Sequence, residues 1–207
     1  MVARKEVKPL KYQKLDGLSE KQLSEHHGVL YTGYVKKWNE IQEKLETVDK
    51  STPNATYSDL RELKLEETFA GNAIILHEMY FANLGGNGTP SGTILEWIKE
   101  DFGSFEKWAE EFKAMGICSR GWVVLGMDVQ SSRLHNYLCD VHNQGGMWGT
   151  APFLILDVYE HAYFIDYATG RKSYIEAFMK NINWDSVNNM IKQWHMDEMR
   201  KAMMVKR

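Results

Sequence analysis

The sequence has few cysteines and no long apolar run. Among its 207 residues are two cysteines, Cys118 and Cys139, too few for a disulfide framework or a cysteine-based zinc site. So low a cysteine content is typical of proteins in a reducing compartment. No stretch of about 18 apolar residues occurs, as a membrane-spanning helix requires, and no apolar segment follows the basic residues at the start. We therefore expect a cytoplasmic protein with no signal peptide and no membrane partner.

The sequence also lacks a surplus of positive charge. It has 25 Lys and Arg against 28 Asp and Glu, a formal net charge of −3. Proteins that bind nucleic acid usually carry a basic patch, so we expect no nucleic-acid partner. Hydrophobic residues make up 43% of the chain, enough for a core. The length suits one domain or two small ones.

Residues 1–16 are basic, polar and irregular, and apolar residues then recur at helical spacing from Leu23 to Ile41. Ser19 has the character of a helix N-cap, and Gln22 three residues later completes a capping-box pattern. This helix should run to about Thr47, where the sequence 51–54 breaks it. A second helix is predicted over roughly 58–82, and the short connection favours an antiparallel helical hairpin.

The segment 83–92 is rich in glycine and is the best candidate for a domain boundary. We therefore predict a helical-hairpin domain over 1–86 and an α/β domain over 87–207, giving an α+β fold. Within the second domain, the pattern predicts helices at 93–101, 105–115, 173–181 and 184–203, and strands at 121–126, 134–141 and 153–157.

Four side chains have the chemistry of metal ligands. Asp157 ends a hydrophobic strand, and His161 follows four residues later. A carboxylate leaving a buried strand needs a partner, which a metal ion or the N-terminus of the next helix would provide. His77 lies in an apolar helical segment and His26 on the first helix; each alone is also explained as an ordinary helix or core residue. Three imidazoles and one carboxylate suit Mn, Fe or Zn, but spacing alone leaves open whether they converge.

At these residues the sequence resembles the iron/manganese superoxide dismutase family. The run 157–163 (DVYEHAY) matches the family signature D-x-W-E-H-A-Y in six of seven places. Further matches flank it over about residues 9–190, in order and with sensible spacing. They include His26 with Tyr34, the run 71–77 with Tyr80, the runs 90–92 and 101–108, Gly121-Trp122, 165–167 through Arg171, and Asn183-Trp184.

The resemblance implies a role for each matching residue. It also implies a hairpin domain followed by an α/β domain with a small three-stranded antiparallel sheet. The positions are His26, His77, Asp157 and His161 as metal ligands, Tyr34 as the gateway to the substrate funnel, Trp122 beside the metal, Glu160 and Tyr163 at the dimer interface, and Arg171 at the funnel mouth.

The sequence departs from the family at several aromatic and histidine positions. Leu30 stands where the family has a histidine that touches the interface tyrosine, so the Tyr163 link across a dimer is lost or rebuilt. Tyr31 stands where many members have a second histidine. Tyr159 and Phe81 replace tryptophans near the metal, and both keep an apolar wall.

In the family, a side chain donates a hydrogen bond to the solvent molecule on the metal, and the sequence must provide a residue for this role. Many iron-dependent members carry a glutamine four residues before the second ligand, where this chain has Ala73. In other members the donor comes from the C-terminal domain. Spacing to Asp157 favours His142, and Gln144 is the alternative.

The resemblance implies a superoxide dismutase that uses one Mn or Fe ion per subunit and works as a homodimer or tetramer. Its substrate is superoxide, which it converts to oxygen and hydrogen peroxide. Alternatives are a metal-binding homologue with little or no turnover, a non-haem iron oxygenase, and an interaction protein without metal. The last predicts that His77→Ala and Asp157→Ala are tolerated.

Overall fold

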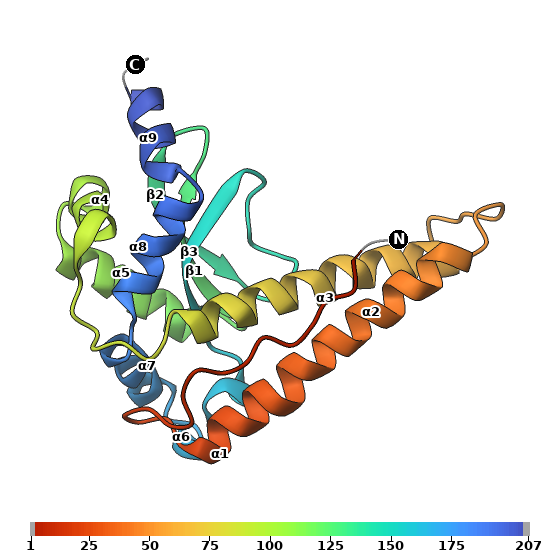
Figure 1. Cartoon of the computed structure of the whole chain (residues 1–207), viewed down its shortest axis with the longest axis horizontal. Coiled ribbons are helices and arrows are strands. Elements are labelled where there is room, and N and C mark those ends of the chain that lie inside the picture. Colours follow the sequence, from red (N-terminus) through yellow and green to blue (C-terminus); the bar gives the residue numbers. More distant parts are fainter. Residues whose placement is uncertain (1–2, 205–207) are drawn as a thin grey trace.

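The computed structural model describes residues 3–204, so the outermost residues of both predicted domains lie outside it. Helices come first, followed by a small sheet with further helices around it, which confirms the predicted α+β class (Figure 1). The helical elements are α1 Glu20–Leu23, η1 Ser24–Tyr31, α2 Thr32–Thr47, α3 Asp59–Ala82, α4 Gly92–Phe102, α5 Phe105–Cys118, η2 Glu160–Ala162, α6 Phe164–Tyr167, α7 Arg171–Lys180, α8 Trp184–Gln193 and α9 Met196–Met204. The strands are β1 Trp122–Asp128, β2 Arg133–Cys139 and β3 Thr150–Asp157.

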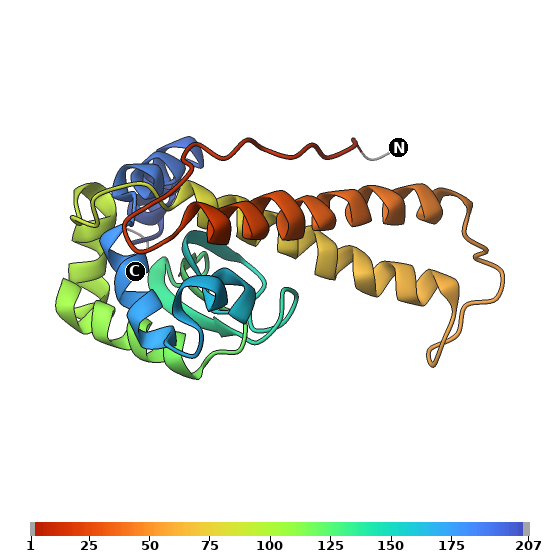
Figure 2. The same ribbon diagram turned by 90° about the horizontal axis from the view of Figure 1, so that it is seen from below.

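The predicted helical hairpin is present and projects from the rest of the molecule (Figure 2). Ser19 caps its first helix, since its hydroxyl accepts a hydrogen bond from the Gln22 backbone N–H at 3.1 Å. Ser58 caps α3 in the same way. The stretch η1 is a π-helix, which the sequence pattern did not predict. Such segments are frequent at functional sites.

A glycine allows the two helices of the hairpin to approach closely. A Cβ atom on Gly71 of α3 would lie 2.6 Å from the ring of Trp38 on α2. Any larger residue would push the helices apart. Because His26 and His77 are carried by the two arms of the hairpin, this close packing also brings the candidate ligands together.

The sheet has the order β2-β1-β3, and both pairings are antiparallel. Trp122, at the start of the central strand, pairs with Cys139 on one side and with Asp157 on the other. Pro152 is tolerated in β3 because β3 is an edge strand. This register places Trp122 directly beside the last residue of β3.

One predicted helix is broken in the structure. The pattern predicts a continuous helix over 184–203, whereas α8 ends at Gln193 and α9 begins at Met196. Between them His195 adopts a positive φ of 53°, which a continuing helix does not permit. The turn brings Arg200 of α9 onto the carboxylates of α4.

Most of the core lies between the sheet and the helices around it. Trp108, Trp122 and Phe153 are among its largest fully buried side chains. Within residues 3–204, no helix has an apolar run long enough to cross a membrane.

Candidate metal centre

The four candidate ligands come from four separate elements. His26 lies on η1, His77 on α3, Asp157 at the end of β3, and His161 on η2. The two arms of the hairpin supply the first two, and the turn after β3 supplies the others. His26 and His161 are 135 positions apart, and their rings lie 4.9 Å apart between centroids because the hairpin packs against the sheet.

The structure brings these four residues into one cluster. One donor atom from each lies within 4.8 Å of all the others. The Oδ2 atom of Asp157 is 3.1 Å from Nε2 of His26, 3.7 Å from Nε2 of His77 and 3.2 Å from Nε2 of His161. His26, His77 and Asp157 are completely buried, and the His161 side chain is 23% exposed.

Burial and the contacts within the cluster together set its charge state. It lowers the pKa of His26, and it lowers the pKa of His77 to about 3. Burial alone would raise the pKa of Asp157, but His161 and His26 outweigh it and hold that pKa well below its usual range. Burial likewise opposes protonation of His161, yet Asp157 raises its pKa. An ionised carboxylate and neutral imidazoles are the forms that ligate metals.

The residues present fit a transition-metal ion. His77 donates from Nδ1 to the carbonyl of Ala73 at 2.7 Å, which leaves its Nε2 lone pair facing the cluster. Nε2 of His77 and both ring nitrogens of His26 are buried without a hydrogen-bond partner among the described residues. Buried polar atoms of this kind are costly unless satisfied. A cation bound at the cluster would satisfy Nε2 of His26 and Nε2 of His77 together, and three nitrogens with one oxygen suit Mn or Fe.

His142 and Tyr34 lie beside the cluster and contact each other. The Trp122 indole N–H donates to Nδ1 of His142 at 3.0 Å, and Nε2 of His142 is 2.9 Å from the Tyr34 hydroxyl oxygen. An indole N–H can only donate, so Nδ1 must accept and the imidazole proton sits on Nε2. Burial lowers the pKa of His142 to about 4, so the ring is neutral at pH 7.

The alternative donor, Gln144, lies elsewhere. It is exposed at the surface, and its backbone N–H bonds to the carbonyl of Val141. Within residues 3–204 its side chain has no hydrogen bond to the cluster or to Tyr34. Of these two candidates, His142 lies against Tyr34, and both of its ring nitrogens are already engaged, by Trp122 and by Tyr34, so His142 can act on a metal-bound solvent only through Tyr34.

The Arg171 guanidinium forms hydrogen bonds with groups other than the four candidate ligands. Its Nε donates to the Tyr163 hydroxyl at 3.0 Å, and its Nη1 donates to the carbonyls of Ser119 and Ile117. Within the described residues it has no direct contact with the four candidate ligands. Tyr163 stacks on Tyr174, with ring centroids 5.0 Å apart. Arg171 therefore reaches the cluster only through intermediate groups.

The aromatic replacements pack against the ligands. Tyr159 stacks on His161 at 5.1 Å between ring centroids, and its backbone N–H donates to Oδ1 of Asp157. Phe81 lies edge-on to His26 at 4.9 Å. Both positions thus retain aromatic contact with the candidate ligands.

One supporting residue was not predicted. The Gln22 side chain is fully buried and donates from Nε2 to the His161 carbonyl at 2.6 Å, while its Oε1 accepts from the Ile165 N–H. We expected this side chain to complete a capping box with Ser19, and that half of the expectation is wrong. The backbone N–H of Ser19 instead donates to the Asp166 carboxylate. The Gln22 side chain is therefore available to bond to the turn that carries His161.

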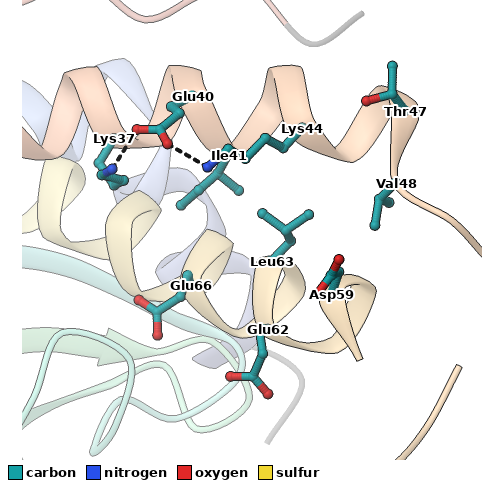
Figure 3. Close-up of a pocket in the computed structure, with 10 residues that line it drawn as sticks. All are labelled: Lys37, Glu40, Ile41, Lys44, Thr47, Val48, Asp59, Glu62, Leu63 and Glu66. Atoms are coloured by element: carbon teal, nitrogen blue, oxygen red, sulfur yellow. Dashed lines mark hydrogen bonds and ion pairs between the residues drawn. The ribbon is translucent and has the colours of Figure 1, made fainter. Parts of the chain in front are cut away.

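The groove at the far end of the hairpin is separate from this cluster (Figure 3). It lies between α2 and α3, with Ile41 and Leu63 at its base and Glu40 bonded to Lys37 and Lys44 at its rim. None of the four candidate ligands lines it. The charged side chains at its rim face solvent, and its lining contains no histidine that could act as a metal ligand.

Comparisons with known proteins identify similar sequences. Residues 90–190 match the family model described as iron/manganese superoxide dismutases, C-terminal domain. "Superoxide dismutase [Fe]" of Aquifex aeolicus is 47% identical over 184 residues, which cover 86% of this chain and 86% of that protein. "Superoxide dismutase [Fe]" of Cupriavidus metallidurans is 42% identical over 184 residues, covering 86% and 92%. "Superoxide dismutase [Mn] 1" of Halobacterium salinarum is 35% identical over 192 residues, covering 89% and 92%.

Proposed function

The chain belongs to the iron/manganese superoxide dismutase family, and we propose that His26, His77, Asp157 and His161 hold the metal ion of its dismutase site. It disproportionates superoxide to oxygen and hydrogen peroxide and uses one Mn or Fe ion per subunit. The observation that carries the ligand assignment is the convergence of three imidazole Nε2 atoms on Oδ2 of Asp157.

When bound, the ion supplies a one-electron couple that oxidises one superoxide and reduces the next. Two superoxide anions and two protons yield one oxygen and one hydrogen peroxide, so the protein must supply protons as well as the ion. The Asp157 carboxylate would offset one unit of the positive charge of the ion, and the three imidazoles would contribute donor nitrogens without charge. The relatives include both Fe and Mn proteins, and both metals accept this donor set.

Tyr34 is the proposed proton donor beside the site. Because Nε2 of His142 carries the ring proton, it donates to the Tyr34 oxygen, and the Tyr34 hydroxyl hydrogen is left free to point toward the site. Burial raises the pKa of Tyr34, so the phenol stays protonated at neutral pH. We therefore assign to Trp122 and His142 the task of orienting the hydroxyl of Tyr34.

This assignment predicts different outcomes for His142 and Gln144. His142→Ala should retain the metal and lower the maximal rate by about 10²-fold, at the low end for a positioned proton-transfer network. Gln144→Ala should leave the rate unchanged. The check is the dismutation rate per bound ion for both variants by pulse radiolysis. The reverse order of effects would mean that Gln144, and not His142, supports the reaction, and would contradict the assignment.

We also propose a homodimer as the minimal assembly, in the cytoplasm. Glu160 is exposed, Tyr163 is buried beside it, and the large side chains of Phe164 and Ile165 are 48% and 45% exposed on the next turn. Exposed apolar side chains grouped in this way are typical of interfaces. Pairing through this surface would place Glu160 against a second subunit. Sedimentation equilibrium should give a dimer or a larger assembly built from it, and a fully active monomer would refute the proposal.

The division into domains at 1–86 and 87–207 likewise remains a proposal. It is supported by the connection 83–91, which separates α3 from α4. The free state of Cys118 and Cys139 supports a reducing compartment.

A further inference from the structure

The segment before the first helix lies along the hairpin. Residues 5–12, called the strap below, form no helix or strand. They run beside α2 and α3 for much of the length of the hairpin (Figure 1). Without secondary structure of its own, the strap depends on hydrogen bonds from the helices beneath it.

Two anchors fix the ends of the strap. The Asn39 side chain accepts from the Lys5 N–H and donates to the Lys5 carbonyl, both at 2.9 Å, as a neighbouring strand would. At the other end, the Tyr12 hydroxyl donates to the carbonyl of Phe81 at 2.9 Å. The anchors span from the middle of α2 to the end of α3.

The middle of the strap is held by a closed ring of interactions, called the clamp below. The Lys8 N–H donates to the Tyr31 hydroxyl oxygen at 3.0 Å, and that hydroxyl donates to Oε1 of Glu78 at 3.0 Å. The Lys8 ammonium closes the ring on Oε2 of Glu78. In addition, His27 donates from Nε2 to the Lys8 carbonyl at 2.8 Å.

Each residue of the clamp on the hairpin adjoins a proposed metal ligand. The Tyr31 ring, 1% exposed, stacks on His77 with 6.3 Å between centroids and 27° between planes. Glu78 directly follows His77, and His27 directly follows His26. A cavity of about 180 Å³ lies between strap and helices, with Lys8 and Lys11 on the strap side and Tyr31 and Phe81 on the helix side. The strap therefore covers residues that adjoin the proposed ligands His26 and His77.

We propose that Tyr31 is a positioning residue through which the strap holds His77 in place. The proposal rests on the proposed ligand set. Tyr31 is one of the positions at which this chain departs from its family's usual residue. Its ring supports the ligand, and its hydroxyl connects that support to the strap. When the clamp opens, the Tyr31 ring is no longer tied to the strap, and His77 loses its lateral support.

The test compares metal release from folded protein. Tyr31→Phe keeps the ring on His77 and removes the hydroxyl that joins Lys8 to Glu78. Asn39→Ala frees the strap at Lys5 without altering a residue that touches a ligand. At a temperature far below unfolding, both should release the ion to a chelator about tenfold faster, the net effect of one or two buried hydrogen bonds. Tyr31→Phe should also shift the absorption spectrum of the bound ion.

Tyr57→Phe is the matched control, because Tyr57 is 65% exposed at the hairpin tip and its hydroxyl bonds to Asp59. It should release metal at the wild-type rate. If both strap variants also do so, or if they release faster only in proportion to a lowered unfolding midpoint, the proposal is overturned. Failure of the ligand assignment is a separate result, since the wild-type protein would then not hold one ion per chain.

Discussion

The His77→Ala variant is expected to lose its metal ion and, with it, dismutation by about 10³-fold or more. The reason is that loss of a ligand should exceed the 10–100-fold cost of losing an outer hydrogen-bond partner. His77 is fully buried, and its Nε2 faces Asp157 with no other partner among the described residues. The measurements are metal content after dialysis and the rate per chain.

His135→Ala is the control for this substitution. His135 is an exposed histidine on β2, away from the cluster, so its removal should change neither metal content nor rate. A His77→Ala protein that keeps a full complement of metal would exclude His77 as a ligand. It would favour instead the interpretation of His77 as an ordinary core histidine.

The second large effect is on stability and concerns the C-terminal helix. Arg200 of α9 is 2% exposed and forms two hydrogen bonds to the Asp101 carboxylate, at 2.7 and 2.9 Å, and one to Glu100. It also lies 4.8 Å from the centroid of the Trp97 ring. Arg200→Met leaves the buried carboxylate of Asp101 without its main partner. Breaking such a pair costs about 3–5 kcal/mol, which for a chain of this size lowers the unfolding midpoint by about 6–20 °C.

Lys113→Met is the matched control for Arg200→Met. The Lys113 and Glu176 side chains are 37% and 47% exposed, and their ion pair should contribute less than about 1 kcal/mol. Thermal unfolding of both variants at equal metal loading measures the difference. Equal, small shifts in the two midpoints would show that the Arg200 pair does not hold α9 in place.

The Arg200 effect should depend on pH. Burial raises the pKa of Asp101, but hydrogen bonds from Arg200, the Leu134 N–H and Arg133 outweigh it, and the net pKa lies below its ordinary value. A depressed carboxyl pKa stabilises the folded state fully above the unfolded pKa, and this stabilisation is lost as the pH falls through the folded pKa. The difference between wild type and Arg200→Met should therefore shrink below about pH 4.

The helices were predictable because their signals are local. Ser19 caps the first helix as predicted, the second helix begins at Asp59 against a predicted start near 58, and the apolar spacing between Leu23 and Ile41 indicates the first arm. The break at His195 was not predictable, because histidine is not a typical helix breaker. Its positive φ turns the chain so that Arg200 reaches Asp101, a contact between distant parts of the sequence.

The proposed ligand residues could be selected from sequence, but their convergence could not. His26 and Asp157 are 131 residues apart and meet because the hairpin packs on the end of β3. Which of His142 and Gln144 faces the site depended on the loop after β2. The second role of Gln22 was hidden because a capping box explained the same spacing. Hydrogen bonds between distant segments leave no periodic signal in the sequence.

The most direct test of the account is the rate of superoxide disproportionation per bound ion, measured on separate Mn-loaded and Fe-loaded samples with one ion per chain. The account predicts that at least one metal gives a rate that approaches the diffusional range, about 10⁸–10⁹ M⁻¹s⁻¹, and this result would also identify the metal that the site uses. Negligible turnover with both metals at full occupancy would contradict it and would identify the chain as a metal-binding homologue without dismutase activity.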